Sequence, residues 1–186
     1  MKYVRAAVMS LLVLGALSPV ASAAPGGRHC AYHLDPVSRS ERIVKAAPRL
    51  IGCYASFAQA ISAGTGGAVQ LDPSASPSTL TDAALGDPVL SASSVLIGTE
   101  FVDAGYGGSS ASYFASATCS STTTWEVAYV TDAWNDMFSS GQGFGGCDHN
   151  KKFEASNFGG SVLTCTPNCT NYGTLNDLIS SLRWKP

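Results

Sequence analysis

The sequence has few charged residues and no cluster of basic ones. Asp, Glu, Lys and Arg make up 13% of its 186 residues, and the formal net charge is −2. A protein that binds nucleic acid or anionic lipid through phosphate groups needs Lys and Arg gathered on one face. The sequence contains no such gathering, so we expect neither kind of partner.

Long apolar runs are also scarce. The one substantial run covers residues 6–20, is interrupted by a proline, and is shorter than the roughly 20 residues that a membrane helix needs. It follows Lys2 and Arg5 and precedes the small residues 21–23, an order typical of a secretory signal peptide. We therefore predict a signal peptide over 1–23, a secreted protein and no membrane span. Cleavage of this signal peptide would remove Lys2 and Arg5. The mature chain would then have nine basic and 13 acidic residues, a net charge of −4.

Catalytic motifs are missing as well. The three histidines are His29, His33 and His149, and none lies in a metalloprotease or nucleophile-elbow pattern. Residues 141–146 have the spacing of a dinucleotide-binding glycine motif, but no strand-then-helix frame surrounds them. We expect a protein that is not an enzyme.

Cysteine is present in an even number, and all six residues follow the predicted signal peptide. In an exported chain this number indicates three disulfides. Metal binding through the Cys165 and Cys169 pair is the alternative, but it needs a second Cys or His pair at similar spacing. Fifteen pairings are open. Nearness in the chain favours Cys30–Cys53, Cys119–Cys147 and Cys165–Cys169.

The residue composition and the hydrophobic pattern change along the chain. Residues 24–71 predict a small α/β lobe, with a strand near Cys30, a helix over 53–63 and a further short strand at 69–71. Residues 72–94 contain prolines and many serines and predict a linker or a long surface loop. Residues 95–186 consist of short apolar runs separated by Gly, Ser and Thr, which favours an all-β sandwich.

An internal repeat lies within residues 95–186. The segment 101–109 (FVDAGYGGS) matches 153–161 (FEASNFGGS), and downstream the hexapeptide 135–140 (NDMFSS) matches 176–181 (NDLISS). Asn-Asp pairs and serines are common in turns, so one hexapeptide match would mean little. However, these are the only two places where Asn or Asp residues are adjacent, and both copies keep the same order. The first copy is eleven residues longer, and we place the excess around 119–124.

Together these elements resemble the two Greek-key motifs of the βγ-crystallin family, and the hexapeptides resemble the calcium signature of its microbial members. The resemblance covers about residues 95–186 and implies a β-sandwich with an aromatic hairpin and a tight glycine in each key. Glycine suits that bend because it adopts positive φ at little cost. The implied hairpin residues are Phe101, Tyr106 and Gly108 in the first key and Phe153, Phe158 and Gly160 in the second.

The resemblance also implies Ca²⁺ ions clamped between the two hexapeptide loops. One ion would be bound by the Met137 carbonyl and the Ser139 hydroxyl, with Asn176 or Asp177 opposite. The other would be bound by the Leu178 carbonyl and the Ser180 hydroxyl, with Asn135 or Asp136 opposite. In each pair the choice between Asn and Asp is open, and we expect Phe138 and Ile179 to face the core.

The donor chemistry of the loops agrees with calcium independently of the family. Ca²⁺ takes six to eight oxygen ligands, and each hexapeptide offers an amide oxygen, a carboxylate, two hydroxyls and turn carbonyls. One carboxylate per loop is little charge, so we expect dissociation constants of about 10⁻⁵ to 10⁻³ M. Such sites would hold structural ions in a calcium-rich medium.

Three functions compete at this stage. The first is a structural calcium-binding protein of the envelope or medium, with calcium ions and a cell-envelope component as partners. The second is a secreted peptidase inhibitor, because some actinobacterial metallopeptidase inhibitors look like one βγ-crystallin domain with disulfides. The third is an antimicrobial toxin on the same fold. An inhibitor needs a rigid exposed loop, and the excess around 119–124 is the candidate.

Overall fold

The computed structural model describes residues 28–35, 48–85 and 94–186. The predicted signal peptide and residues 86–93 of the predicted linker lie outside this part. In chain order the elements are β1 His29–Leu34, β2 Arg49–Tyr54, α1 Phe57–Gly64, α2 Asp82–Leu85, β3 Val95–Asp103, β4 Gly107–Ala115, β5 Trp125–Val127, β6 Ser140–Gly143, β7 His149–Ala155, β8 Gly159–Cys165 and β9 Ser181–Lys185, with 3-10 turns at Pro77–Thr79, Ser156–Phe158 and Gly173–Leu175.

The strands form two sheets that enclose one core. The first sheet has the order β2-β1-β4-β3-β6 and the second the order β5-β9-β7-β8. Each half of the repeat contributes to both sheets: β5 of the first half pairs with β9, while Cys169 of the second half forms a bridge to Gly141 in β6. The predicted all-β sandwich of two Greek keys is confirmed.

Strand β1 joins the regions that the sequence analysis separates. It pairs in parallel with β4, from His29 opposite Ser110 onward, and so extends the first sheet. Its Tyr32 lies in the same core cluster as the buried Trp134, whose indole N–H donates to the Tyr32 hydroxyl at 2.8 Å. The N-terminal segment therefore supplies part of the core between the sheets.

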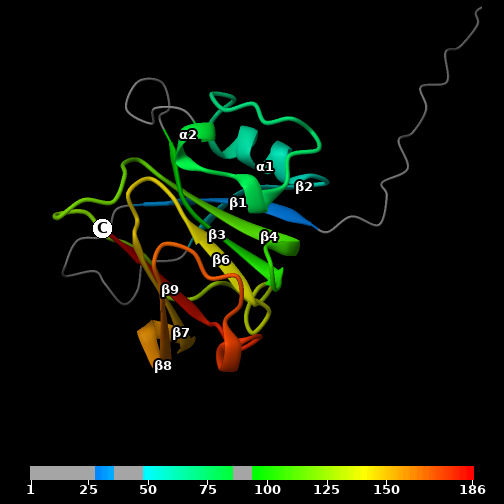
Figure 1. Ribbon diagram of the computed structural model, residues 1–186. Coiled ribbons are helices and arrows are strands. Elements are labelled where there is room, and N and C mark those ends of the chain that lie inside the picture. The colour runs from blue at the N-terminus through cyan, green and yellow to red at the C-terminus, as the bar shows by residue number, and fades with distance from the viewer. Residues whose placement is uncertain (1–27, 36–47, 86–93) are drawn as a thin grey trace, which may run out of the picture.

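Helix α1 covers the outer face of the first sheet, with α2 close by (Figure 1). Its Phe57 and Ile61 pack in one apolar cluster with Phe101 and Phe114 of the sheet. Gly64 allows the close approach, because a Cβ at this position would overlap the Phe114 ring. The outward-facing apolar residues of β3 and β4 are thus buried under the N-terminal segment.

The boundaries of this segment differ from the prediction. The helix begins at Phe57, after a capping box in which Ser56 and Gln59 bond each other's backbone N–H groups. Cys53 lies instead in β2, opposite Cys30. The predicted strand at 69–71 is absent, because the Val69 N–H is turned back to the Thr65 hydroxyl at 3.1 Å.

The described part of the predicted linker packs against the body of the protein. Leu80 is buried in the cluster under α1. The carboxylate of Asp82 accepts a hydrogen bond from the Gly145 N–H at 2.8 Å, which links α2 to the connection between the two keys. Among the helices of the described segments, none has the length and apolarity to cross a bilayer.

All six cysteines are paired. The three disulfides are Cys30–Cys53, Cys119–Cys147 and Cys165–Cys169, which confirms the pairing that nearness in the chain favours. Cys165 and Cys169 are thereby excluded as metal ligands.

Candidate metal-binding loops

The two copies of the repeat fold into matching hairpins. Tyr106 and Phe158 both adopt positive φ, at 65° and 64°. Each lies beside the first aromatic residue of its own copy: Phe101 and Tyr106 have ring centroids 5.7 Å apart, and Phe153 and Phe158 are 5.6 Å apart. Both copies therefore have the aromatic hairpin that the resemblance implies.

The glycines of the hairpins are also where backbone geometry requires them. Gly108 and Gly160 have φ of 70° and 74°, in the left-handed region that favours glycine. A Cβ on Gly108 would lie 2.6 Å from a carboxylate oxygen of Asp103 and from a methyl group of Val102. Any larger residue would have to displace the hairpin.

The last serine of each hexapeptide ties its loop to the hairpin, a role that the sequence analysis missed. The Ser140 hydroxyl donates to the Asp103 carbonyl at 2.6 Å and accepts from the Tyr106 N–H at 3.0 Å. The second copy has the same two bonds, at 2.7 and 3.0 Å, among Ser181, Ala155 and Phe158. The joint recurrence of hairpin and hexapeptide in the sequence is the signal of this coupling.

The two hexapeptide loops lie side by side and exchange backbone hydrogen bonds. The Asp136 N–H donates to the Ile179 carbonyl at 3.2 Å, and the Asp177 N–H donates to the Phe138 carbonyl at 3.0 Å. Asp136 and Asp177 share positive φ, at 58° and 55°. The second position of each loop therefore faces the fourth position of the other.

Side chains also meet across the loops. The Ser139 hydroxyl donates to Oδ1 of Asp177 at 3.1 Å. Asn176 acts within its own loop, where its Oδ1 accepts from the Tyr172 N–H at 3.0 Å. Asn135 donates to its neighbour Asp136 at 2.6 Å. Of the residues predicted to lie opposite Ser139, it is Asp177 that the fold brings to this hydroxyl.

Some backbone carbonyls of the hexapeptide loops accept hydrogen bonds and others do not. Those of the fourth and fifth positions accept backbone hydrogen bonds, namely the carbonyls of Phe138, Ser139, Ile179 and Ser180. Within the part of the chain that the structure describes, no hydrogen bond uses the carbonyl of Met137 or Leu178. These two side chains are exposed, whereas Phe138 and Ile179 are fully buried, as predicted.

The acidic residues of the described ranges are spread out. These ranges hold no group of three or more His, Cys, Asp or Glu side chains placed to bind a metal ion. A metal bound at the loops would depend on a mixed set of oxygens: one carboxylate, one hydroxyl and one carbonyl for each ion, completed by water.

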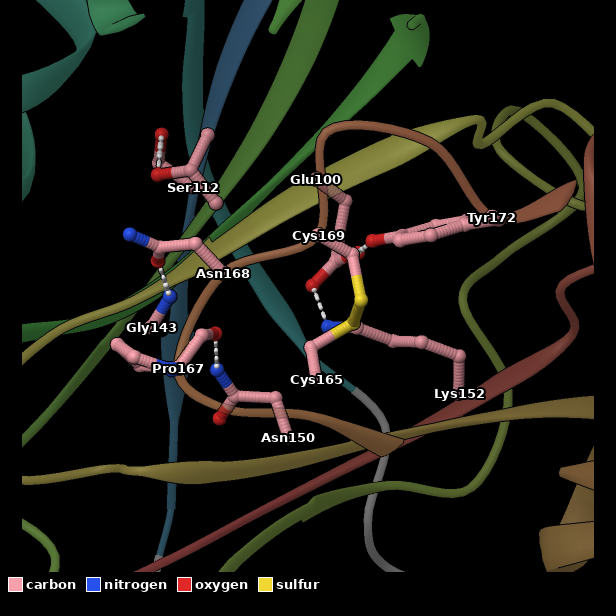
Figure 2. Close-up of polar contacts among 11 residues, drawn as sticks. Glu100, Ser112, Gly143, Asn150, Lys152, Cys165, Pro167, Asn168, Cys169 and Tyr172 are labelled. Atoms are coloured by element: carbon pink, nitrogen blue, oxygen red, sulfur yellow. Dashed lines mark hydrogen bonds and ion pairs between the residues drawn. A yellow bond between two sulfur atoms is a disulfide. The ribbon is translucent and has the colours of Figure 1, made fainter. Parts of the chain in front are cut away.

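A buried polar group between the sheets is a second feature that the sequence analysis missed. Glu100 of β3 and Lys152 of β7 form an ion pair with both side chains fully buried, and the Tyr172 hydroxyl donates to the other Glu100 oxygen (Figure 2). The sequence does contain a signal of this pair. Glu100 and Lys152 are 52 residues apart and stand directly before the first aromatic of each copy, at equivalent positions.

Comparison with known proteins gives matches among solved structures. No protein-family model and no curated protein matches the chain. A βγ-crystallin from an archaeon matches at 19% identity and a TM-score of 0.36, over 48% of this chain and 98% of that one. A βγ-crystallin domain from Clostridium beijerinckii matches at 22% identity and a TM-score of 0.36, over 48% and 97%. A clostrillin double mutant in complex with nickel matches at 19% identity and a TM-score of 0.36, over 48% and 98%.

The two sheets of the chain itself define its class, an all-β sandwich of two Greek keys. Within this class the chain resembles βγ-crystallin domains, as the repeat predicts, over about half of its length. This likeness concerns the fold alone.

Proposed function

We propose that the chain is a secreted, non-catalytic protein whose two hexapeptide loops bind two structural Ca²⁺ ions, each shared between the loops. The observation that carries the proposal is the contact of the Ser139 hydroxyl with the Asp177 carboxylate across the loops, at 3.1 Å. With the free Met137 carbonyl they form the first site. By the symmetry of the repeat, the second site would consist of the Leu178 carbonyl, the Ser180 hydroxyl and Asn135 or Asp136, and the reciprocal backbone bonds between the loops support this pairing.

The donor set fits calcium. Two oxygens 3.1 Å apart can both lie within the roughly 2.3–2.6 Å that Ca²⁺ requires of its ligands. Asn176 is occupied with the Tyr172 N–H, so Asp177 is the better ligand of the first site. A bound ion would replace the Ser139–Asp177 hydrogen bond and neutralise the carboxylate. The backbone hydrogen bonds between the two loops would hold the ligands of each ion in place.

Calcium is expected to bind with a stoichiometry of two and to raise the melting temperature. An ion that binds only the folded state adds about 2.7 kcal/mol per site at a hundredfold excess over its dissociation constant. Magnesium is the control, because it demands a smaller octahedron and holds its waters. The measurement is calorimetric titration together with melting in calcium, magnesium or chelator. The absence of binding heat, with melting that ignores chelator, would contradict the proposal.

A second candidate, a peptidase inhibitor, is favoured by one feature. Residues 116–124 form a largely exposed loop with a bridge between Ser120 and Thr123, and the Cys119–Cys147 disulfide anchors it. Rigid exposed loops suit inhibitors because little ordering is needed on binding. An assay against secreted metallo- and serine peptidases tests this candidate, and the absence of inhibition across the panel would remove it.

A further inference from the structure

The Glu100–Lys152–Tyr172 group joins the two Greek keys at their symmetry-related positions. Glu100 lies on β3 of the first sheet and Lys152 on β7 of the second, and both side chains are 0% exposed. One carboxylate oxygen, Oε1, contacts the Lys152 amine, and the other, Oε2, accepts a hydrogen bond from Tyr172 (Figure 2). The two oxygens of a single carboxylate therefore have different partners.

The surroundings of the group are aromatic and tightly packed. The Lys152 amine lies 5.5 Å from the centre of the Trp184 ring and 5.9 Å from that of Tyr172. Gly141 leaves space for the contact, because a Cβ there would overlap the Tyr172 hydroxyl and come within 2.6 Å of Oε2 of Glu100. The amine and the carboxyl carbon are thus held together in a region closed to bulk water.

Burial also changes the protonation of the pair. It raises the pKa of the Glu100 carboxyl and lowers the pKa of the Lys152 amine, while the attraction between the two groups opposes both shifts. The raised carboxyl pKa and the lowered amine pKa both favour the neutral acid and the neutral amine. In water, a carboxyl group and an amine do not condense, because both are charged and the large excess of water favours hydrolysis. In the buried pair, the charges are less favoured and bulk water is excluded.

We propose that the Lys152 amine attacks the Glu100 carboxyl carbon and forms an intramolecular amide bond that links the two Greek keys. Starting from the ion pair, one proton passes from Nζ to Oε1, the Nζ–Cδ bond forms, and a second proton follows to Oε1. The Cδ–Oε1 bond then breaks and releases one water molecule. The product keeps one hydrogen on Nζ, so atoms and charge balance without any co-reactant.

Tyr172 is the positioning residue of this step. Its hydroxyl donates to Oε2, the oxygen that carries negative charge in the tetrahedral intermediate and becomes the amide carbonyl. A hydrogen bond aimed at such an oxygen contributes about 10²–10³-fold in rate in enzymes. Fixed proximity supplies effective concentrations of about 10⁵–10⁸ M in well-oriented intramolecular reactions.

Intact-mass analysis of the folded, secreted full chain tests the proposal. We expect a mass lower than that calculated for the chain without its signal peptide by one water molecule, in addition to two hydrogen atoms for each of the three disulfides. Peptide mapping should then find one branched peptide joining Glu100 to Lys152. A mass that lacks only the disulfide hydrogens, or a water loss that maps elsewhere, would overturn the proposal. The measurement needs no variant and does not depend on calcium.

Variants then assign the roles. Lys152→Arg keeps the charge but removes the nucleophilic amine, so its mass should not show the loss of a water molecule. Lys151→Arg, at the partly exposed neighbouring position, is the matched control and should show the same water loss as the unchanged chain. Tyr172→Phe should slow the water loss by about 10²-fold, followed in newly synthesised protein quenched at successive times. Water loss in Lys152→Arg would contradict the bond, and an unchanged rate in Tyr172→Phe would contradict the role of the tyrosine.

Discussion

Replacing Lys152 by methionine is expected to lower the free energy of unfolding by at least about 3–5 kcal/mol, because Glu100 is left as an uncompensated buried carboxylate and the proposed amide is lost as well. Both side chains are 0% exposed, so water cannot replace the lost amine. The matched control is Lys151→Met on the same strand, where the side chain is partly exposed and the change should stay within about 0.5 kcal/mol. Urea or guanidinium unfolding measures both, and equal stability of the two variants would contradict a stabilising contact between Glu100 and Lys152 in the interior.

The double variant Glu100→Leu/Lys152→Met separates the buried charge from the loss of the proposed amide. Neither it nor Lys152→Met can form that bond, so their difference reports the orphaned carboxylate, offset by the Tyr172 hydroxyl that loses its acceptor in the double variant. Because an apolar pair needs no desolvation of charge, the double variant should be the more stable of the two. If it is the less stable, the interior tolerates a lone carboxylate and the interpretation of the pair is wrong.

The pH dependence of Lys152→Met has a definite sign. Burial raises the pKa of Glu100, and the amine that opposes this effect is gone. A raised carboxyl pKa means that the folded state binds the proton more tightly than the unfolded state. The contribution of protonated Glu100 to the stability of Lys152→Met is therefore fully present below the ordinary carboxyl pKa. It is lost as the pH rises through the pKa of Glu100 in the folded state. The double variant should lack this slope, and a slope of the opposite sign would contradict the assignment.

The second large effect is expected from the disulfide between the keys. Cys119 and Cys147 are 28 residues apart, and removing the bond by a double alanine substitution should cost about 3–4 kcal/mol on the chain-entropy estimate. Cys165–Cys169 closes a separation of only 4 residues, for which the same estimate gives about 2 kcal/mol. Thermal unfolding of the two variants gives the comparison. The reverse order would show that local packing outweighs loop closure.

The hairpins and the loops could be predicted from the sequence because their geometry is local. The positive φ of Gly108 and Gly160 requires glycine, so a glycine recurs at the same place in both copies. The hydrogen bonds that couple each loop to its hairpin require a hydroxyl, so Ser140 and Ser181 recur at matching positions. The three disulfides follow from short separations along the chain.

The place of β1 could not be predicted, because its partners are remote. The backbone N–H of Arg28 donates to Ser109, 81 residues away, and the Trp134 to Tyr32 hydrogen bond spans 102 residues. No periodicity within the segment shows that it extends the sheet of a later repeat. The choice between Asn176 and Asp177 was open for another reason: it depends on the Tyr172 N–H, only 4 residues away, which donates to the side-chain oxygen of Asn176, and the hexapeptide pattern does not show this bond.

Burial of Lys152 was missed for a different reason. Lys151 and Lys152 are adjacent and identical in type, and a charged residue in a strand is ordinarily exposed. Only the pairing of β7 with β8 and β9 decides that Lys152 faces the interior. The sequence therefore predicts the frame of the repeat better than it predicts what lies between the two copies.

The most direct test of shared calcium sites compares two double variants by calorimetric titration. Ser139→Ala/Asp177→Gly removes two ligands of one proposed site, so one calcium ion should still bind with near-native affinity. Ser139→Ala/Asp136→Gly removes one ligand from each site, so both ions should bind weakly. Glycine removes the side-chain oxygen and suits the positive φ of both positions. Ser121→Ala, in the exposed loop, is the control and should bind two ions. If each loop bound its own ion, the second variant would keep one intact site and the first would weaken both, and that result would contradict the account.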